Sequence, residues 1–322
     1  MRDGRKSLIV RAGRLFQEIM PLLRFMDYPF RVPFIFRENQ SHIPAVFIIA
    51  PPRSGSTLTY QLLCNCFENE HLTNISNLLY ATPVIGSMIS NNLCKNYQTD
   101  FKSEKGFVSG LCGEAEGLRF WEYWAGQGLV ENRNSHKVRK LRKLEQLLSK
   151  LHSSDKKVYI SGYLGHVFCV QLLRKIFPKS IFIHLERNIL DNVSSILRVS
   201  PDDNFSLQPK SLEGFKGSRT ERVVRQVITI QSLILDNEAE DTIRIHYEDL
   251  CNHPLNTIEE IRKFAEKQGI SMNLSENIFI PEKFKISKVD KTSEENKRLY
   301  EIIQREISIL PQAKRKYFEK LH

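Results

Sequence analysis

Short apolar runs alternate with longer amphipathic stretches along most of the chain. Strands are predicted where such runs are rich in β-branched and aromatic residues, at 45–50, 158–161, 180–185 and 242–246. Two of these runs lack polar alternation, which is typical of strands covered on both faces. Helices are predicted where apolar residues recur at helical spacing, at 58–67, 138–151, 167–177, 190–197, 219–235, 255–267 and 294–309. The alternation predicts an α/β fold in which helices flank a parallel sheet.

The domain organisation follows from what the chain lacks. Its 322 residues fit one large domain or two modest ones, and no linker or internal repeat divides them. We therefore predict a single domain over 1–322, with an N-terminal helical extension at 1–40 that contains an amphipathic surface helix at 8–23. The stretch 83–128 holds seven of the 15 glycines and has poor periodicity. We expect an excursion over the sheet at 83–135, which contacts the substrate together with a second loop at 202–217.

The composition is typical of a globular protein, and the positive net charge favours anionic partners. Hydrophobic residues make up 41% and charged residues 26%, which excludes intrinsic disorder and fibrous repeats. The net charge of +10 favours an anionic partner such as a nucleotide, an acidic glycan, nucleic acid or a membrane surface, unless the surface is merely rich in lysine. The basic stretch 136–157 is interpreted as a solvated helix face, with a polyanion-binding patch as the alternative.

Targeting signals and cysteines bear on the compartment. No run approaches the roughly 18 apolar residues of a membrane-spanning helix, and the pattern of a signal peptide is missing, so we predict no transmembrane segment. The six cysteines show no Cys-x-x-Cys spacing, and Cys64 and Cys66 fall in a helical pattern where free buried thiols are the rule. This pattern predicts a reducing compartment, the cytoplasm.

The most informative stretch is a predicted strand, loop and helix at 47–63. The loop carries Arg53, Ser54, Gly55 and Ser56, and the helix is expected to open near Thr57. Unpaired N–H groups at a helix start attract an anion, Gly55 allows close backbone approach, and the hydroxyls add donors.

The stretch differs from the phosphate loop of ATPases and GTPases. Ser56 stands where that pattern has the lysine that reaches the β- and γ-phosphates, and a positive charge appears in the loop as Arg53 instead. The loop therefore predicts a phosphate-bearing ligand other than ATP or GTP, in a P-loop-like fold.

The run Pro52-Arg-Ser-Gly-Ser-Thr-Leu58 resembles the 5′-phosphosulfate loop of sulfotransferases that use 3′-phosphoadenosine 5′-phosphosulfate (PAPS), in the branch with Pro-Arg-Ser-Gly-Thr-Thr-Leu. The resemblance implies that the donor contacts Arg53, Ser54, Gly55, Ser56, Thr57 and Leu58.

A second element matches the same family downstream. Arg187 ends a predicted strand and Ser195 follows eight residues later, with Asp191 between them and Arg198 on the same helix face. The resemblance implies that Arg187 and Ser195 bind the 3′-phosphate. The family often has Asp-Pro where this chain has Asn188-Ile-Leu190, which alters the turn but neither anion contact.

A third match is Tyr247-Glu-Asp-Leu250, whose tyrosine the resemblance places near the adenine. The three elements together cover roughly 45–265.

The catalytic base is not evident from this pattern. A branch of the family has a glutamate about twenty residues after the loop, where this chain has Thr73-Asn-Ile-Ser-Asn77. We predict Glu116, or else Glu114, as the base, because flanking apolar residues raise a carboxyl pKa toward the useful range. His166 is an alternative base, and both acids being solvated is another interpretation. Arg53 is predicted to stabilise the leaving phosphate.

Two lysines near the C-terminus are candidates for further donor contacts. Lys285 and Lys288 either close over the donor or belong to a basic surface loop.

These observations predict a sulfotransferase that moves a sulfuryl group from PAPS, its co-substrate, to a hydroxyl in preference to an amine. The acceptor is a glycan, glycolipid or small metabolite, and we expect no metal requirement and no nucleic acid partner. The alternatives are a P-loop NTP-dependent kinase-like enzyme and a non-catalytic polyanion-binding protein.

Overall fold

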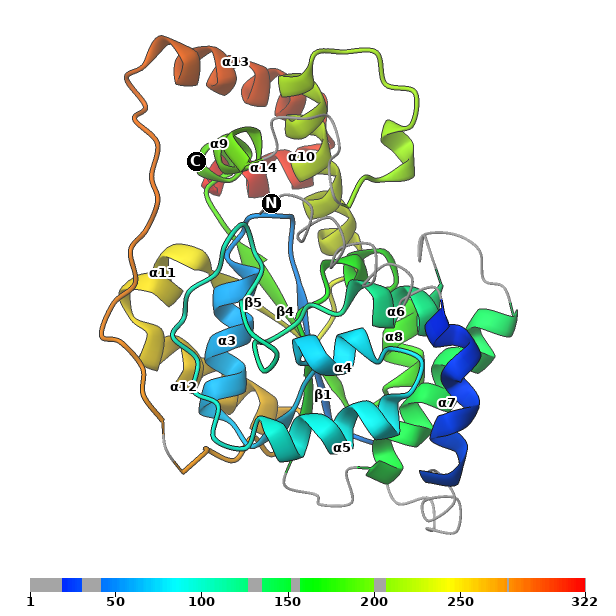
Figure 1. Ribbon diagram of the computed structural model, residues 1–322. Helices are drawn as coiled ribbons and strands as arrows, with labels where there is room; N and C mark the ends of the chain where they lie inside the picture. The colour runs from blue at the N-terminus through cyan, green and yellow to red at the C-terminus, as the bar shows by residue number, and fades with distance from the viewer. Residues whose placement is uncertain are drawn as a thin grey trace, which may run out of the picture.

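The computed structural model describes residues 19–30, 42–126, 135–151, 157–199, 207–276 and 278–321. Within them, parallel strands form one sheet in the order β2-β3-β1-β4-β5 (Figure 1). The strands are β1 (Ala45–Ile49), β2 (Asn69–Glu70), β3 (Val158–Ser161), β4 (Ser180–Glu186) and β5 (Thr242–His246). The predicted parallel α/β fold is confirmed, and β2 is an additional edge strand too short to give a sequence pattern.

Helices flank the sheet (Figure 1). The α-helices are α3 (Ser56–Cys66), α4 (Asn74–Leu78), α5 (Pro83–Leu93), α6 (Leu118–Ala125), α7 (Ser135–Leu151), α8 (Val170–Ile176), α9 (Ile189–Val199), α10 (Arg219–Asn237), α11 (Tyr247–Asn252), α12 (Pro254–Lys267), α13 (Glu294–Ser308) and α14 (Gln312–Lys320). The 3-10 helices are η1 (Met20–Asp27), η2 (Leu164–Phe168) and η3 (Lys210–Leu212).

The two faces of β1 are buried in different hydrophobic clusters. Phe47 points into the cluster formed with α6, α7, α8 and η1, whereas Val46 and Ile48 point into the cluster formed with α3, α11 and α12. Every residue of β1 and of β4 is buried. A strand covered on both faces needs no polar alternation, so the pattern of these two runs is explained.

The stretch expected to be an irregular excursion contains regular structure. Residues 83–93 form α5 and 118–125 form α6, joined by a loop. Helix α5 escaped prediction because it consists of small, apolar and amide residues without a charge, and so shows no polar face. The expected helix at 167–177 is divided into η2 and α8.

The cysteines do not support the expected reducing compartment. Cys94, at the end of α5, and Cys112, in the following loop, form a disulfide, whereas Cys64, Cys66, Cys169 and Cys251 are free. A pair 18 residues apart has no sequence signature, because the turn that brings it together depends on the fold. The cysteines therefore do not carry the argument for a reducing compartment.

Parts of four predicted segments lie outside the described residues: 1–18 and 31–40 of the N-terminal extension, which include 8–18 of its helix, 127–134 of the excursion, 152–156 of the basic stretch and 202–206 of the second loop. No helix in the portion the structure describes has the length and apolarity required to cross a membrane.

Candidate active site

The loop between β1 and α3 is shaped by Gly55. Gly55 precedes the first turn of α3 with φ of 93°, and a Cβ on it would lie 2.2 Å from Cδ2 of Tyr247. Both the backbone angle and the close ring therefore require glycine. The first turn of α3 holds no acidic residue. Its N–H groups consequently make a favourable site for an anion.

The loop and the end of β4 meet at one place. The Arg187 Nη1 donates to the Arg53 carbonyl at 2.7 Å, and the Arg53 Nε donates to the Ser195 hydroxyl at 3.5 Å. The backbone of Arg53 has φ of 64°, a conformation that non-glycine residues adopt rarely. Because β1 and β4 are neighbours, their carboxyl ends form the crevice where open α/β sheets bind ligands.

Arg187 is held from several sides and still has donor capacity. Its Nη2 donates to the Ser287 carbonyl at 2.8 Å, and its guanidinium lies 4.6 Å from the ring centre of Tyr247. Its Nε is buried and has no hydrogen-bond partner among the described residues. An unpaired buried donor on a guanidinium is costly, and an anion in this position would satisfy it.

Asn192 is a contributor that the sequence did not reveal. Its amide donates to the Pro52 carbonyl at 2.8 Å and to the Ser54 hydroxyl at 3.3 Å. Ser54 is thus turned toward helix α9 and is not among the cavity-lining residues. A single amide on a helix has no distinguishing pattern, so nothing local would have identified Asn192.

A cavity of about 560 Å³ opens in front of the loop. Residues from the loop and α3 line it together with Arg187 and Tyr247; those predicted for the donor site are Arg53, Gly55, Ser56, Thr57 and Leu58. Gly106 covers this wall, since a Cβ on it would lie 3.6 Å from Arg53 Nη1 and from Thr57 Oγ1. The excursion therefore forms part of the cavity wall beside the phosphate loop.

Glu116 is the acid that faces this loop. Thr57 Oγ1 donates to its Oε1 at 3.4 Å, and the carboxyl lines the cavity. Burial raises the pKa of Glu116 to about 7, while the bond from Thr57 and the charge of Arg53 act to lower it. A group with such a pKa can accept a proton near neutral pH.

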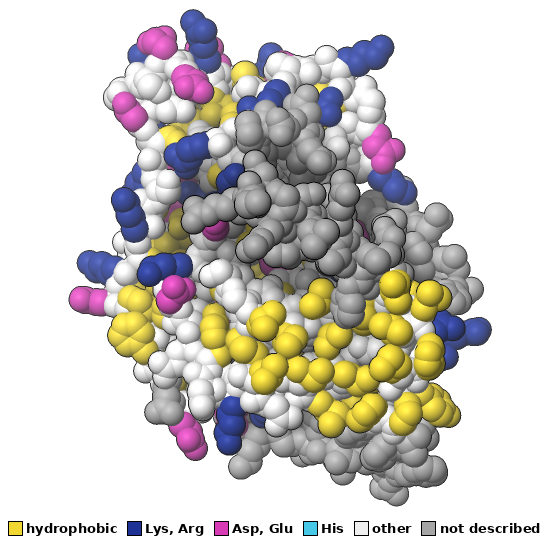
Figure 2. All heavy atoms as spheres, in the orientation of Figure 1, with side chains coloured by type: hydrophobic (Ala, Val, Ile, Leu, Met, Phe, Trp, Pro, Cys, Tyr) yellow, Lys and Arg dark blue, Asp and Glu magenta, His cyan; other side chains and the backbone are white. Residues whose placement is uncertain are grey.

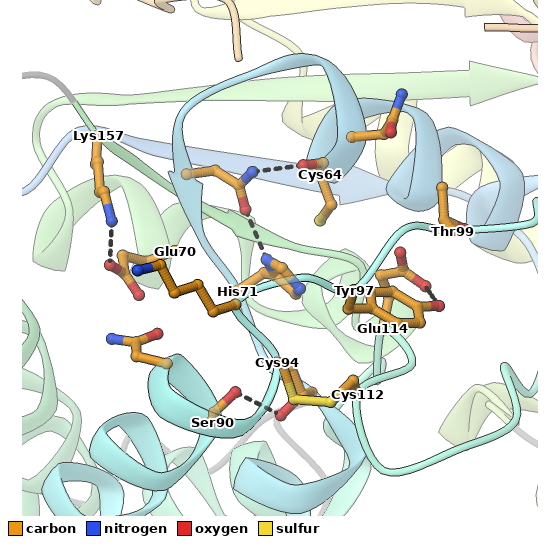
Figure 3. A pocket seen from close by; sticks show the side chains of 15 residues that line it. Cys64, Glu70, His71, Ser90, Cys94, Tyr97, Thr99, Cys112, Glu114 and Lys157 are labelled. Atoms are coloured by element: carbon orange, nitrogen blue, oxygen red, sulfur yellow. Dashed lines mark hydrogen bonds and ion pairs between the residues drawn. A yellow bond between two sulfur atoms is a disulfide. The ribbon is translucent and has the colours of Figure 1, made fainter. Parts of the chain in front are cut away.

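Glu114 points elsewhere. Its backbone pairs with Thr73, and its Oε2 accepts a hydrogen bond from the Tyr97 hydroxyl at 3.2 Å (Figure 3). Glu114 lines a second pocket of about 380 Å³, whose wall includes the disulfide, as well as the cavity in front of the loop. The pairing with Thr73 places the 114–116 segment beside 73–77, the stretch where the family branch carries its glutamate.

His166 is a core residue. It is fully buried between the rings of Phe47 and Trp121, and its Nε2 lies 2.8 Å from the Ser161 hydroxyl. Burial lowers the pKa of His166 to about 3. The ring does not line the cavity, which argues against its use as a base.

The C-terminal segment crosses the end of β4 through its backbone. The Ser287 carbonyl accepts from Arg187, and the Val289 N–H donates to Asp191 at 2.8 Å. The side chains of Lys285 and Lys288 are exposed and do not line the cavity. Across the parts of the chain that are placed, no three His, Cys, Asp or Glu side chains gather where they could hold a metal ion.

Comparisons with known proteins agree with this geometry. A model of the sulfotransferase family matches residues 44–268, so the chain belongs to the sulfotransferase family. A search of curated protein sequences found no match.

Solved structures are similar at low identity. Sulfotransferase STF1 from Mycobacterium tuberculosis H37Rv is 12% identical with a TM-score of 0.50, covering 90% of this chain and 83% of its own. Sulfotransferase STF9 from Mycobacterium avium is 14% identical with a TM-score of 0.47, covering 74% and 68%. At these identities the likeness to STF1 supports the α/β fold alone.

Proposed function

We propose that the protein transfers a sulfuryl group from PAPS to a hydroxyl, in preference to an amine, of a glycan, glycolipid or small metabolite. The observation that carries this proposal is the meeting of Arg53, Arg187 and Ser195 at the carboxyl ends of β1 and β4. Two anion-binding elements 134 positions apart in the sequence thereby serve one ligand.

The donor contacts divide between its two phosphates. The N–H groups at Gly55, Ser56 and Thr57 and the Arg53 guanidinium bind the 5′-phosphosulfate. The Nε of Arg187 and the Ser195 hydroxyl bind the 3′-phosphate, which separates PAPS from ordinary adenosine nucleotides. Tyr247 lies close enough to both elements to contact the nucleoside.

The chemistry is a displacement at sulfur. The acceptor oxygen forms a bond to sulfur as the bond between sulfur and the phosphate oxygen breaks, and the acceptor's proton passes to Glu116. Arg53 neutralises the charge that develops on the departing phosphate. By analogy with phosphoryl transfer, positioning and neutralisation supply most of the acceleration.

The proposal extends to organisation and compartment. We infer that 1–322 acts as one domain and that 83–135 supplies acceptor contacts, since Gly106, Phe107 and Leu118 line the cavity. We keep the cytoplasm as a proposal that the cysteines do not support, because the Cys94–Cys112 disulfide is of a kind rare in reducing compartments.

Nucleotide discrimination tests the donor assignment. By calorimetry we expect 3′-phosphoadenosine 5′-phosphate to bind roughly 10- to 100-fold more tightly than AMP, the effect of one or two charged hydrogen bonds. Arg187→Ala should erase the difference and Arg187→Lys should restore part of it. Equal affinity of the unaltered protein for the two nucleotides, or magnesium-dependent ATP turnover, would refute PAPS as the donor.

A further inference from the structure

An apolar patch lies on one face of the molecule. Figure 2 shows hydrophobic side chains gathered over η1 and α5, with Lys and Arg at one border. We define this apolar face by its exposed members: Leu22, Phe25, Met26, Tyr28 and Phe30 in and after η1, Met88 and Leu93 of α5, and Leu111. Exposed apolar areas of this extent mark contact with a partner or a membrane.

The elements under this face form one unit. Helix η1 packs on α5, and the buried Asp27 carboxylate accepts hydrogen bonds from the N–H groups of Val84 and Ile85. The disulfide joins the end of α5 to the loop that carries Leu111. The exposed side chains are therefore held on a fixed surface.

On η1, α5 and α7 the exposed charges with described side chains are all positive. Asp27 is the only acid of η1 and is buried, α5 carries no charge, and Arg24 is exposed. Helix α7 continues this border: Arg139, Arg142 and Lys143 are exposed, whereas its single acid, Glu145, is buried. Arg24 is near enough to Lys140 to help burial lower the pKa of that lysine to about 8.

We propose that the apolar face and helix α7 bind an anionic lipid surface. Phenylalanine and leucine side chains beside lysine and arginine are the combination with which helices lie in a membrane interface. The inward orientation of both acids removes the groups that anionic lipids would repel. This assigns a role to the basic stretch 136–157, which the donor site leaves unused. A second copy of the chain would bring the basic helices of both copies together and is disfavoured by their repulsion.

Vesicle binding tests this proposal independently of catalysis. We expect the protein to cosediment with phosphatidylcholine vesicles that contain about a third phosphatidylserine, and much less with phosphatidylcholine alone. Phe25→Ser should lower the affinity about tenfold or more, the value of one buried aromatic side chain. Arg142→Gln with Lys143→Gln should lower it roughly 30-fold on anionic vesicles only.

A matched control is available. Phe25 is 68% exposed and Phe279, on the segment after α12, is 70% exposed, so Phe279→Ser makes the same change outside the apolar face. We expect it to leave vesicle binding unchanged, and neither substitution removes a buried group. Absence of binding to anionic vesicles would overturn the proposal. Equal losses of vesicle affinity in Phe25→Ser and Phe279→Ser would also overturn it. So would a dimer of the unaltered protein, detected by sedimentation, that Phe25→Ser converts to monomers.

Discussion

Glu116 is the residue on which the proposed proton transfer depends. Its carboxyl must be ionised to accept the proton, and its pKa is about 7. We therefore expect kcat/KM for sulfuryl transfer to rise with pH up to about 7 and then level off. Thr57→Val removes a donor that lowers this pKa, so the rise should move to higher pH.

Two further variants separate the acids. Glu116→Gln should reduce kcat by about 100-fold or more and abolish the rise. Glu114→Gln should keep it, because the Glu114 carboxyl is bonded to the Tyr97 hydroxyl and not to the phosphate loop. An unchanged pH profile in Glu116→Gln would show that another group is the base.

Single residues also show what sequence can and cannot supply. The family pattern located Arg53, Arg187 and Ser195, and the structure brings them together. The pattern did not indicate that Arg187 donates two of its N–H groups to backbone carbonyls, because such bonds depend on the fold. His166 shows the opposite case, since a histidine near a site resembles a base until its burial is known.

At the scale of elements, the excursion is secured by the Cys94–Cys112 disulfide. A loop of this length is worth roughly 3 kcal/mol in the chain-entropy account, so Cys94→Ser with Cys112→Ser should lower the unfolding free energy by about that amount. The nucleotide affinity should fall as well, because the loop carries Gly106 to the wall formed by Arg53 and Thr57. Chemical denaturation and calorimetry would measure the two effects.

A control for this prediction is Cys64→Ser. This change removes a free thiol that lines the same pocket as the disulfide. If the double variant and the control have the same stability, the disulfide does not secure the excursion.

Element prediction succeeded where the pattern was strong. The strands β1, β3, β4 and β5 lie where apolar runs predicted them, because burial on both faces or on one leaves a pattern in sequence. It failed for β2, which has only two residues. It also failed for α5 and α6, which are stabilised by packing against neighbouring elements and were not recognised from the spacing of their apolar residues.

At the scale of the whole molecule, stability should depend on pH through a buried histidine. His166 is neutral in the folded protein, with a pKa of about 3, whereas an unfolded histidine binds a proton below about 6.5. The unfolded state then binds more protons as pH falls, so the unfolding free energy should drop by up to about 1.4 kcal/mol per pH unit below 6.5.

This slope is measurable by urea denaturation at pH 7 and pH 5. His166→Asn should flatten it, while the exposed His253→Asn should not. Equal slopes in His166→Asn and the unaltered protein would mean that His166 is accessible to protons in the folded state.

The arrangement of the whole sheet was beyond sequence. Parallel topology follows from alternating strands and helices, but the order β2-β3-β1-β4-β5 is set by contacts between distant segments. That order makes β1 and β4 neighbours and so permits one ligand to contact both anion-binding elements.

A crystal structure with bound 3′-phosphoadenosine 5′-phosphate tests the central claim most directly. We predict the 5′-phosphate at the N–H groups of Gly55 to Thr57, the 3′-phosphate on Arg187 Nε and the Ser195 hydroxyl, and Glu116 facing the space beyond the 5′-phosphate. A nucleotide bound elsewhere, or one that leaves Arg187 and Ser195 without a phosphate contact, would contradict the account.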